Sequence, residues 1–327
     1  MNIIIDAMGG DNAPEEIVKG GVSASNELGV TVTLVGQRER INEELAKHVY
    51  DLNKVNVLDA ASVVYMEDDP TSVIKHKKDS SMCVGLYALA DGKGDAFVSA
   101  GSTGALVTGA TLIAKRIKGV RRVALSVAMP AKDSFYLLID GGANVECTPD
   151  FLAQFASMGS IYMKKVFDIE SPAVGLVNIG SEEEKGTETI QKANKILKGT
   201  GHINYIGYVE PRDIPAGAAD VVVCDGFTGN VILKLVEGVG LTFYQMIKDI
   251  FMQNMLSNLA ALLVKTGLKD LKKKMDYTEV GGAPLLGCSK PVIKAHGSSN
   301  AKAIHNAVKQ AVKYVETGVI DEIGKEV

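Results

Sequence analysis

Six glycine-rich turns, each placed where a short apolar run ends, constrain this chain more than any other feature. Several of them lead directly into a helical pattern. A strand that turns through glycines onto a helix start brings backbone N–H groups and the positive end of a helix dipole to one place. In open parallel sheets such strand ends line the ligand crevice, so six of them together indicate a site for a small anion. The turns are residues 6–11 (DAMGGD), 99–105 (SAGSTGA), 140–144 (DGGAN), 178–186 (NIGSEEEKG), 225–230 (DGFTGN) and 295–301 (AHGSSNA).

Strand-like and helical patterns alternate from the N-terminus onward. Residues 3–5 form an apolar run, and the helical pattern that follows has Pro14 in its first turn. Residues 173–178 and 221–224 read as short strands of the kind buried inside a parallel sheet. This alternation indicates βαβ units, so we expect an α/β fold with a large, mostly parallel sheet in a single domain over residues 1–327.

Two segments depart from that alternation. Residues 123–129 and 135–139 are strand-like runs joined by the turn PAKDS, which favours a β-hairpin. Residues 67–79 are polar, and we expect an exposed, mobile loop there.

The composition excludes several classes of protein. The chain is 46% hydrophobic and 23% charged, with a net charge of −4, so no overall basic field suits nucleic acid. Its four cysteines are scattered without a C-x-x-C pair, which argues against zinc and against a disulfide framework. The sequence has no signal-peptide pattern and no apolar window of the ~18 residues that a membrane span needs. We therefore expect a cytoplasmic protein with no metal and no nucleic-acid partner.

Nucleotide-binding fingerprints are missing as well. No G-x-G-x-x-G follows a strand-like run, and GSEEEKGT (residues 180–187) differs from a Walker loop because its lysine precedes the second glycine. We therefore expect neither a nucleotide-dependent dehydrogenase nor a P-loop kinase, and no cofactor.

The turn SAGSTGA is the strongest candidate for binding phosphate. Ser102 and Thr103 can present hydroxyl groups, while Gly101 and Gly104 let backbone amides approach an anion closely. The alternative is an ordinary strand-to-helix turn in which Ser102 caps the helix.

The turns DGGAN and DGFTGN each pair a carboxylate at a strand end with an amide four or five residues later. Such groups can orient an acid or hold a hydroxyl, or they can act as helix caps and Asx turns. We place Asp140 and Asn144 with the phosphate-binding residues, and Asp225 and Asn230 with the catalytic residues.

Three further residues are candidates for catalysis. Asn178 and Lys185 belong to NIGSEEEKG, where Lys185 is either the partner of a dianion or a solvated residue at an acidic helix start. His296, in KAHGSS, follows a strand-like run and is either a proton donor near neutral pH or a hydrogen-bonded structural residue.

Residues 241–275 differ in character from the rest of the chain. They contain six lysines against two aspartates, and residues 250–264 form an uncharged stretch too short and too polar to span a membrane. An amphipathic helical hairpin with an apolar tip and basic flanks suits an anionic membrane surface or an acidic partner. Alternatively, its apolar side packs in the core or against a second copy. The expected contact residues are Phe251, Met252, Met255, Leu256, Leu259, Lys272, Lys273 and Lys274.

These turns, in this order, resemble those of the bacterial acyl-acyl-carrier-protein:phosphate acyltransferases of phospholipid synthesis. The resemblance covers nearly the whole chain, with departures at Ser102, where family members commonly have asparagine, and at Gly141, where they have another residue. The matching motifs are DAMGGD, SAGSTGAL (residues 99–106), GAN (142–144), NIG with KG (178–180 and 185–186), DGFTGN, GGAPLLG (281–287) and KAHGSS (294–299).

The resemblance implies a reversible transfer of a long acyl group from acyl carrier protein to inorganic phosphate, giving acyl phosphate for a membrane glycerol-phosphate acyltransferase. It also implies a three-layer α/β/α fold similar to isocitrate and isopropylmalate dehydrogenases, and a homodimer. The basic, apolar hairpin leads us to expect peripheral association with an anionic membrane, and the reaction requires no cofactor. A phosphotransacetylase-like enzyme that acts on acyl coenzyme A is the alternative.

The residues suit that reaction. Phosphate is itself a nucleophile, so no side chain needs to be acylated, and no G-x-S-x-G elbow occurs. The main tasks are to hold the dianion in line with the carbonyl and to stabilise the oxyanion. We expect the Ser102 turn to bind phosphate with Lys185 as a possible charge partner. His296 or Lys185 would then protonate the leaving thiolate or stabilise the oxyanion. Asn178, Asn230 and Asp225 would orient these two side chains.

An acidic carrier protein needs a basic surface on which to dock. Two groups of cationic residues are candidates for this docking surface, together with the lysines of residues 269–274. The first group is Lys75, Lys77 and Lys78, and the second is Arg116, Lys118, Arg121 and Arg122.

Overall fold

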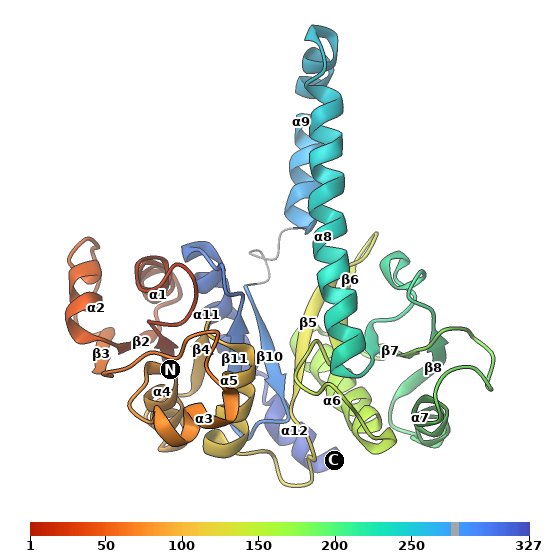
Figure 1. Ribbon diagram of the computed structural model, residues 1–327, viewed down its shortest axis with the longest axis horizontal. Coiled ribbons are helices and arrows are strands. Elements are labelled where there is room, and N and C mark those ends of the chain that lie inside the picture. The colour runs from red at the N-terminus through yellow and green to blue at the C-terminus, as the bar shows by residue number, and fades with distance from the viewer. Residues whose placement is uncertain (276–280) are drawn as a thin grey trace.

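The computed structural model describes residues 1–275 and 281–327, which form an α/β body and a projecting helical hairpin (Figure 1). The described residues contain one 11-stranded sheet of order β3-β2-β1-β4-β11-β10-β5-β6-β9-β7-β8. Its strands are β1 (Asn2–Asp6), β2 (Thr31–Gly36), β3 (Val55–Asp59), β4 (Ala96–Ser99), β5 (Ala124–Pro130), β6 (Phe135–Ile139), β7 (Ala173–Val177), β8 (Asn204–Val209), β9 (Val221–Val223), β10 (Gly282–Leu286) and β11 (Val292–Ala295).

The sheet consists of two parallel halves that run in opposite directions. Strands β3, β2, β1, β4 and β11 are parallel to one another, and so are β6, β9, β7 and β8. Between the halves lie three antiparallel pairings, β11 with β10, β10 with β5, and β5 with β6. Three reversals leave β6 antiparallel to β11, so the carboxyl ends of the two halves point to opposite edges of the sheet.

Helices cover both faces of this sheet and give the expected three-layer α/β/α arrangement. They are α1 (Glu15–Leu28), α2 (Arg38–Leu45), α3 (Pro70–His76), α4 (Ser81–Ala90), α5 (Thr103–Gly109), α6 (Pro149–Phe167), α7 (Glu188–Lys198), α8 (Gly226–Phe251), α9 (Met255–Met275), α11 (Ala301–Glu316) and α12 (Val319–Glu326). The largest core cluster joins one face of the sheet to α1, α6, α11 and α12, while α3, α4 and α5 pack on the other face. In β1, Ile3 and Ile5 belong to the first cluster and Ile4 to the second, which is the two-residue alternation of a strand buried on both faces.

The β5–β6 hairpin is confirmed, with Val127 opposite Leu138 in an antiparallel pair. The expectation of a mobile loop over residues 67–79 is wrong, because α3 lies there and anchors the segment through Val73, which is 1% exposed. The polar composition of the segment gave no sign of this buried anchor. Strands β8 and β10 and helices α7 and α12 were also not expected from the sequence.

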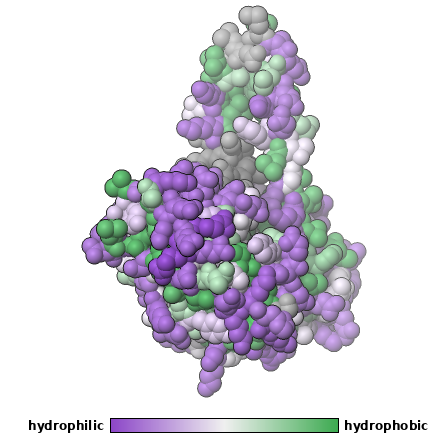
Figure 2. Space-filling view, turned by 60° about the vertical axis from the view of Figure 1, so that its left-hand side comes forward, coloured by the Kyte–Doolittle hydropathy of each residue, from purple (hydrophilic) through white to green (hydrophobic). Residues whose placement is uncertain are grey.

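Helices α8 and α9 project from the body as the hairpin expected over residues 241–275 (Figure 1). Helix α8 begins at the end of β9, well before the hairpin leaves the body, so one continuous helix connects the sheet to the projection. In Figure 2 polar and apolar residues are interspersed over the visible part of the hairpin. Among the described residues, none of the helices has the length and apolar character that crossing a bilayer requires.

Candidate active site

The six glycine-rich turns form two groups instead of one. Cluster A contains residues 6–11, 99–105 and 295–301, which follow the neighbouring parallel strands β1, β4 and β11. Cluster B contains residues 140–144, 178–186 and 225–230, which follow β6, β7 and β9. The two clusters follow opposite edges of the sheet, because the three antiparallel pairings reverse its second half.

A buried polar network fixes the loops of cluster A. The Asp6 carboxylate accepts a hydrogen bond of 2.7 Å from the Ser99 hydroxyl, and Ser99 Oγ accepts one of 3.1 Å from the Gly101 backbone N–H. Lys294 lies in the same network and donates from Nζ to the Ala100 carbonyl at 3.3 Å. Burial lowers the pKa of Lys294 to about 8, although the nearby Asp6 carboxylate opposes this shift. A cation therefore lies beneath the SAGSTG turn at neutral pH.

Ser102 occupies the N-cap position of α5, is 7% exposed and makes no side-chain cap hydrogen bond. This contrasts with the cap residues of α4, α6, α7, α8 and α11, whose side chains all accept a hydrogen bond from their own helix. The alternative of an ordinary cap at Ser102 is therefore wrong. The start of α5 keeps its positive end available to an anion.

The other residues of this turn are tightly placed. Gly101 is buried, and its N–H is already used by Ser99, whereas Thr103 is partly buried and Gly104 is exposed. A Cβ at Gly104 would lie 2.8 Å from Pro70 Cγ, so α3 packs closely over the turn.

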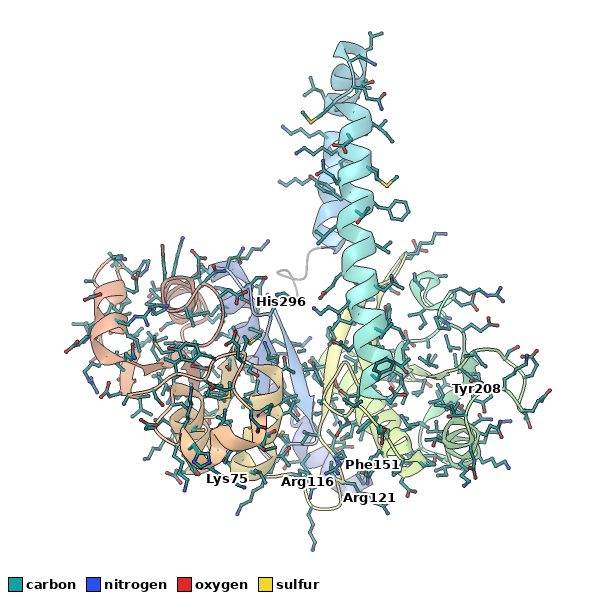
Figure 3. The ribbon with its side chains drawn as sticks, viewed as in Figure 1. Lys75, Arg116, Arg121, Phe151, Tyr208 and His296 are labelled. Carbon is teal, nitrogen blue, oxygen red and sulfur yellow. The ribbon has the colours of Figure 1, made fainter. Side chains whose placement is uncertain are left out.

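His296 lies at the end of β11 and is partly buried (Figure 3). The Ser298 backbone N–H donates to Nδ1 at 3.3 Å, and the Ser298 hydroxyl lies 2.8 Å from the same atom. Because a backbone N–H can only donate, Nδ1 is an acceptor and the neutral ring carries its proton on Nε2. Burial lowers the pKa of His296, so the ring is neutral at pH 7 and suits hydrogen-bond donation better than proton transfer as an imidazolium.

Asp140 is the centre of cluster B. Its carboxylate is fully buried and accepts five described hydrogen bonds, from the backbone N–H groups of Leu125, Gly142, Ala143 and Asn144 and from the Asn144 side chain. The second hydrogen of the Asn144 amide goes to the Val123 carbonyl at 2.7 Å. Burial raises the pKa of Asp140, while these donors oppose the rise. Both of its oxygens organise the loop, and contact between Asp140 and phosphate stays a prediction.

Asn178 and Lys185 lie on the loop between β7 and α7. The Asn178 amide is buried and donates at 3.1 Å both to the Gly180 carbonyl and to the Lys185 carbonyl. Gly186 has φ +87, and a Cβ there would lie 2.2 Å from Asn178 Oδ1. Asn178 thus holds the loop closed on itself, and the Lys185 side chain is exposed. Lys185 and the Ser102 turn belong to different clusters. This arrangement argues against the binding of one phosphate ion by both of them.

The third loop of cluster B starts α8. Asp225 is its N-cap and accepts from the Thr228 N–H at 2.8 Å and from the Thr228 hydroxyl at 3.1 Å. Asn230 is exposed one turn later. Gly229 cannot be replaced without rearrangement, because a Cβ there would lie 1.9 Å from the Asp140 carbonyl oxygen.

Helix α8 connects the two clusters. Lys234 and Glu237, which form an ion pair of 2.8 Å, both influence the pKa of His296 in cluster A. They lie four and seven residues beyond Asn230 of cluster B, or about 6 and 10 Å along the helix axis. Residues 230–237 of α8 therefore lead from cluster B toward the surroundings of His296. Asp6, Ser99 and Lys234 were not predicted as site residues, since a strand-end aspartate, a serine and a helical lysine carry no distinctive spacing.

The expected contact residues of the hairpin are described only in part. Met252 and Leu256 are 62% and 81% exposed, and Phe251 is partly buried. The backbones of the remaining contact residues belong to α9, and their side chains lie outside the part of the chain that the structure describes: Met255, Leu259, Lys272, Lys273 and Lys274. Within residues 1–275 and 281–327 no group of three or more His, Cys, Asp or Glu side chains is arranged to hold a metal ion.

Comparison with known proteins gives one family over the whole chain. The family model described as "Fatty acid synthesis protein" matches residues 1–322. A phosphate acyltransferase of Clostridium acetobutylicum is 47% identical over 327 residues, covering 100% of this chain and 98% of the relative. A phosphate acyltransferase of Alkaliphilus oremlandii is 48% identical, covering 100% and 97%.

Solved structures with the same fold are more distant in sequence. A phosphotransacetylase of Streptococcus pyogenes aligns with a TM-score of 0.66 at 18% identity, over 97% of this chain and 94% of that one. A 4-hydroxythreonine-4-phosphate dehydrogenase of Klebsiella pneumoniae aligns with a TM-score of 0.55 at 13% identity, over 96% and 99%. At these identities the likeness concerns the fold alone.

Proposed function

The chain belongs to the fatty acid synthesis protein family whose curated relatives are named phosphate acyltransferases, and from this premise we propose that it transfers a long acyl group from acyl carrier protein to inorganic phosphate. It is an acyltransferase of lipid synthesis. The carrier protein, the chain length and the roles of single residues are parts of the proposal.

The observation that carries the proposal is the open N-terminus of α5 above a buried cation. Ser102 leaves the first turn of α5 uncapped, and Lys294 lies beneath the preceding residues. Phosphate bound there interacts with the helix dipole, with backbone N–H groups and with the Lys294 ammonium. The Ser102 and Thr103 hydroxyls add donors to its oxygens.

In the reaction a phosphate oxygen attacks the thioester carbonyl carbon, the C–S bond breaks, and the carrier thiol leaves as a thiolate that takes up a proton. His296, with its proton on Nε2, donates to the oxyanion that forms on the carbonyl. Lys185 stabilises and protonates the departing thiolate from the side of cluster B. Asn178 positions Lys185 through the loop, while Asp225 sets the start of α8 and therefore the place of Asn230.

The charge of Lys294 makes a pH-dependent prediction. Its pKa of about 8 means that the ammonium is charged below that pH and neutral above it. We expect the dissociation constant for inorganic phosphate to rise about fivefold to tenfold between about pH 7 and pH 9.5, because one favourable charge is lost. Calorimetric titration measures this. Lys294→Met should bind phosphate weakly at both pH values, and a wild-type affinity that stays constant would contradict the role.

The direct test of the function is the formation of acyl phosphate, trapped with hydroxylamine. Palmitoyl carrier protein, palmitoyl coenzyme A and acetyl coenzyme A are supplied separately, each with and without phosphate. We expect phosphate-dependent product with the palmitoyl carrier protein at the highest kcat/KM. A preference for acetyl coenzyme A would instead establish the phosphotransacetylase alternative.

The hairpin supports a second part of the proposal, contact with an anionic membrane where the product is consumed. Met252 and Leu256 lie exposed at the end of the hairpin away from the body, with lysines on the flanks. We expect Met252→Asp/Leu256→Asp to reduce sedimentation with anionic vesicles about tenfold or more while leaving the acyltransferase rate unchanged. Val49→Asp/Leu52→Asp, which alters two exposed residues far from the hairpin, is the matched control. Equal sedimentation of both variants would contradict membrane contact by this tip.

The family resemblance also implies a homodimer, and the exposed apolar residues of α8 support this part of the proposal. Leu235, Val239 and Phe243 are 63%, 43% and 58% exposed along one side of α8, and they line an open groove of about 320 Å³. A second copy would cover them. Sedimentation equilibrium measures the mass directly, and a monomer at micromolar concentration would contradict this assignment.

A further inference from the structure

Five exposed cations lie close together on the connection between η1 (Ala110–Ala114) and β5. We call residues 115–122 the basic loop. The side chains of Ile117 and Val120 are buried and hold the loop on the body, so its cations point outward. Those cations are Lys115, Arg116, Lys118, Arg121 and Arg122. Residues 96–132 contain no aspartate or glutamate, and of the five cations only Arg121 forms a described ion pair, with Asp150.

The basic loop has a defined shape. Its backbone is held by the Ile117 N–H, which donates to the Gly287 carbonyl at 2.9 Å, and by the Gln154 side chain, which donates to the Gly119 carbonyl at 3.1 Å. Arg122 lies over the Phe151 ring at 5.4 Å. An open pocket of about 370 Å³ is lined by the loop and by Thr111. A fixed backbone that presents exposed cations around a depression is suited to recognising an acidic surface.

The basic loop adjoins cluster B of the candidate active site. Arg122 precedes Val123, whose carbonyl accepts the hydrogen bond from the Asn144 side chain. Arg121 forms an ion pair of 2.8 Å with Asp150 at the start of α6, and Figure 3 shows Arg116, Arg121 and Phe151 together below the start of α8. A macromolecule on this loop therefore lies next to the loops that carry Asn144 and Asn230.

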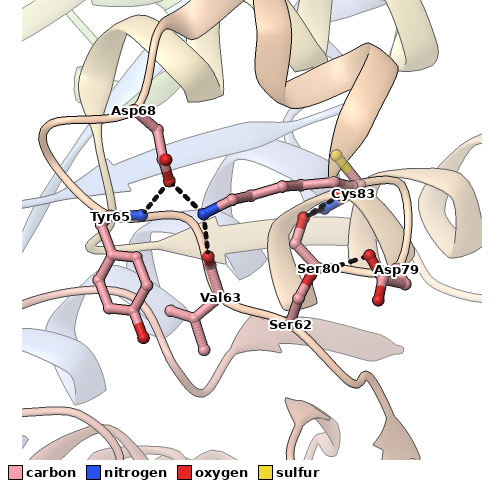
Figure 4. Close-up of polar contacts among 8 residues, drawn as sticks. Ser62, Val63, Tyr65, Asp68, Asp79, Ser80 and Cys83 are labelled. Atoms are coloured by element: carbon pink, nitrogen blue, oxygen red, sulfur yellow. Dashed lines mark hydrogen bonds and ion pairs between the residues drawn. The ribbon is translucent and has the colours of Figure 1, made fainter.

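The lysines of residues 75–78 are a weaker candidate for the same role. Lys77 donates to the Asp68 carboxylate at 2.6 Å and to the Val63 carbonyl at 3.0 Å, and its ammonium lies 4.9 Å from the centre of the Tyr65 ring (Figure 4). Residues 67–79 contain four acidic residues against three lysines, so this surface carries no net positive charge. Of the lysines of residues 269–274, only Lys269 has a described side chain, and it is exposed on the projecting hairpin, away from the clusters.

We propose that the basic loop is the docking surface for the acidic carrier protein, which enters beside cluster B and extends its thioester along α8 toward the phosphate in cluster A. The inference rests on the proposed function. The acyl carrier protein would approach the enzyme from the side of the basic loop. A carrier protein docked at this edge does not cover the upper part of α8 or the hairpin. The hairpin can therefore contact the membrane while the carrier protein is bound.

The test uses charge reversal of two exposed lysines, Lys115→Glu/Lys118→Glu, in the full chain. We expect the KM for palmitoyl carrier protein to rise about tenfold or more, and the salt dependence of kcat/KM to weaken, because the attraction across the interface is lost. With palmitoyl pantetheine, which has no protein and no charge, kcat/KM should stay within about twofold of wild type. The matched control is Lys75→Glu/Lys78→Glu, which makes the same change of charge on the other lysine surface.

The outcomes separate this inference from the proposed function. An unchanged KM for the carrier in the 115/118 variant, or an equal rise in the 75/78 variant, would overturn docking on the basic loop while leaving the acyl transfer intact. Failure of wild-type protein to form acyl phosphate from either thioester would instead overturn the proposed function. A thermal unfolding curve equal to that of wild type shows that the variant retains its fold.

Discussion

Asp140→Ala should destabilise the protein by about 3–5 kcal/mol, because four buried or partly buried backbone N–H groups and one side-chain amide lose their acceptor together. The carboxylate joins β5, through the Leu125 N–H, to the whole 140–144 loop. Loss of this group also releases Asn144 and disturbs the contact of the loop with Gly229. Urea unfolding followed by circular dichroism measures the change in the free energy of unfolding.

Asp140→Asn is the informative companion variant. It retains the shape and one acceptor oxygen but places an N–H₂ group against backbone donors, so we expect a smaller but clear loss of stability. Asp133→Ala, at an exposed position on the β5–β6 turn, is the control and should stay within about 0.5 kcal/mol of wild type. If Asp140→Ala cost less than about 1 kcal/mol, the described network would not be a stabilising centre.

His296→Ala and Lys185→Ala should each reduce kcat for acyl phosphate formation by about 100-fold to 1,000-fold, the range for removing one donor from a developing charge. His296 donates from Nε2 to the oxyanion, whereas Lys185 acts on the thiolate. The two variants should therefore differ when the leaving group changes. A thioester with a more acidic thiol should rescue Lys185→Ala and leave His296→Ala unaffected, because a better leaving group needs no proton.

The conservative variants and controls make this assignment specific. His296→Gln retains an N–H donor and should recover part of the activity lost in His296→Ala. His48→Ala and Lys192→Ala, which alter a histidine and a lysine outside both clusters, should retain wild-type rates. Near wild-type activity of His296→Ala and Lys185→Ala would refute both roles.

The strand–helix alternation and the anion-binding turns could be predicted because they are local. The β5–β6 hairpin follows from two apolar runs and a short turn, and α8 follows from a cap and a long periodic pattern. The reversal of the second half of the sheet could not be predicted, because it depends on β10 pairing between β11 and β5. The glycine and the proline of β10 are unfavourable in a strand, so only its long-range partners make this segment a strand.

The sequence predicted which residue types belong to the candidate site, but only part of their contacts. Asp140 and Asn178 were expected as functional side chains, and both are engaged with backbone groups that the sequence does not reveal. Ser102 is the opposite case, since its residue type suggests a helix cap and the structure shows none. Lys294 has an unusual environment only because the pairing of β4 with β11 places it beneath Ala100.

Acyl exchange without phosphate tests the central claim that phosphate attacks the thioester directly. Palmitoyl carrier protein is mixed with isotopically labelled, unacylated carrier protein and the enzyme, and transfer of the palmitoyl group to the labelled carrier is followed by mass spectrometry. Direct attack predicts no transfer until phosphate is added, after which the acyl group equilibrates through acyl phosphate. Transfer in the absence of phosphate, with a palmitoyl adduct on a side chain of the enzyme, would contradict the account.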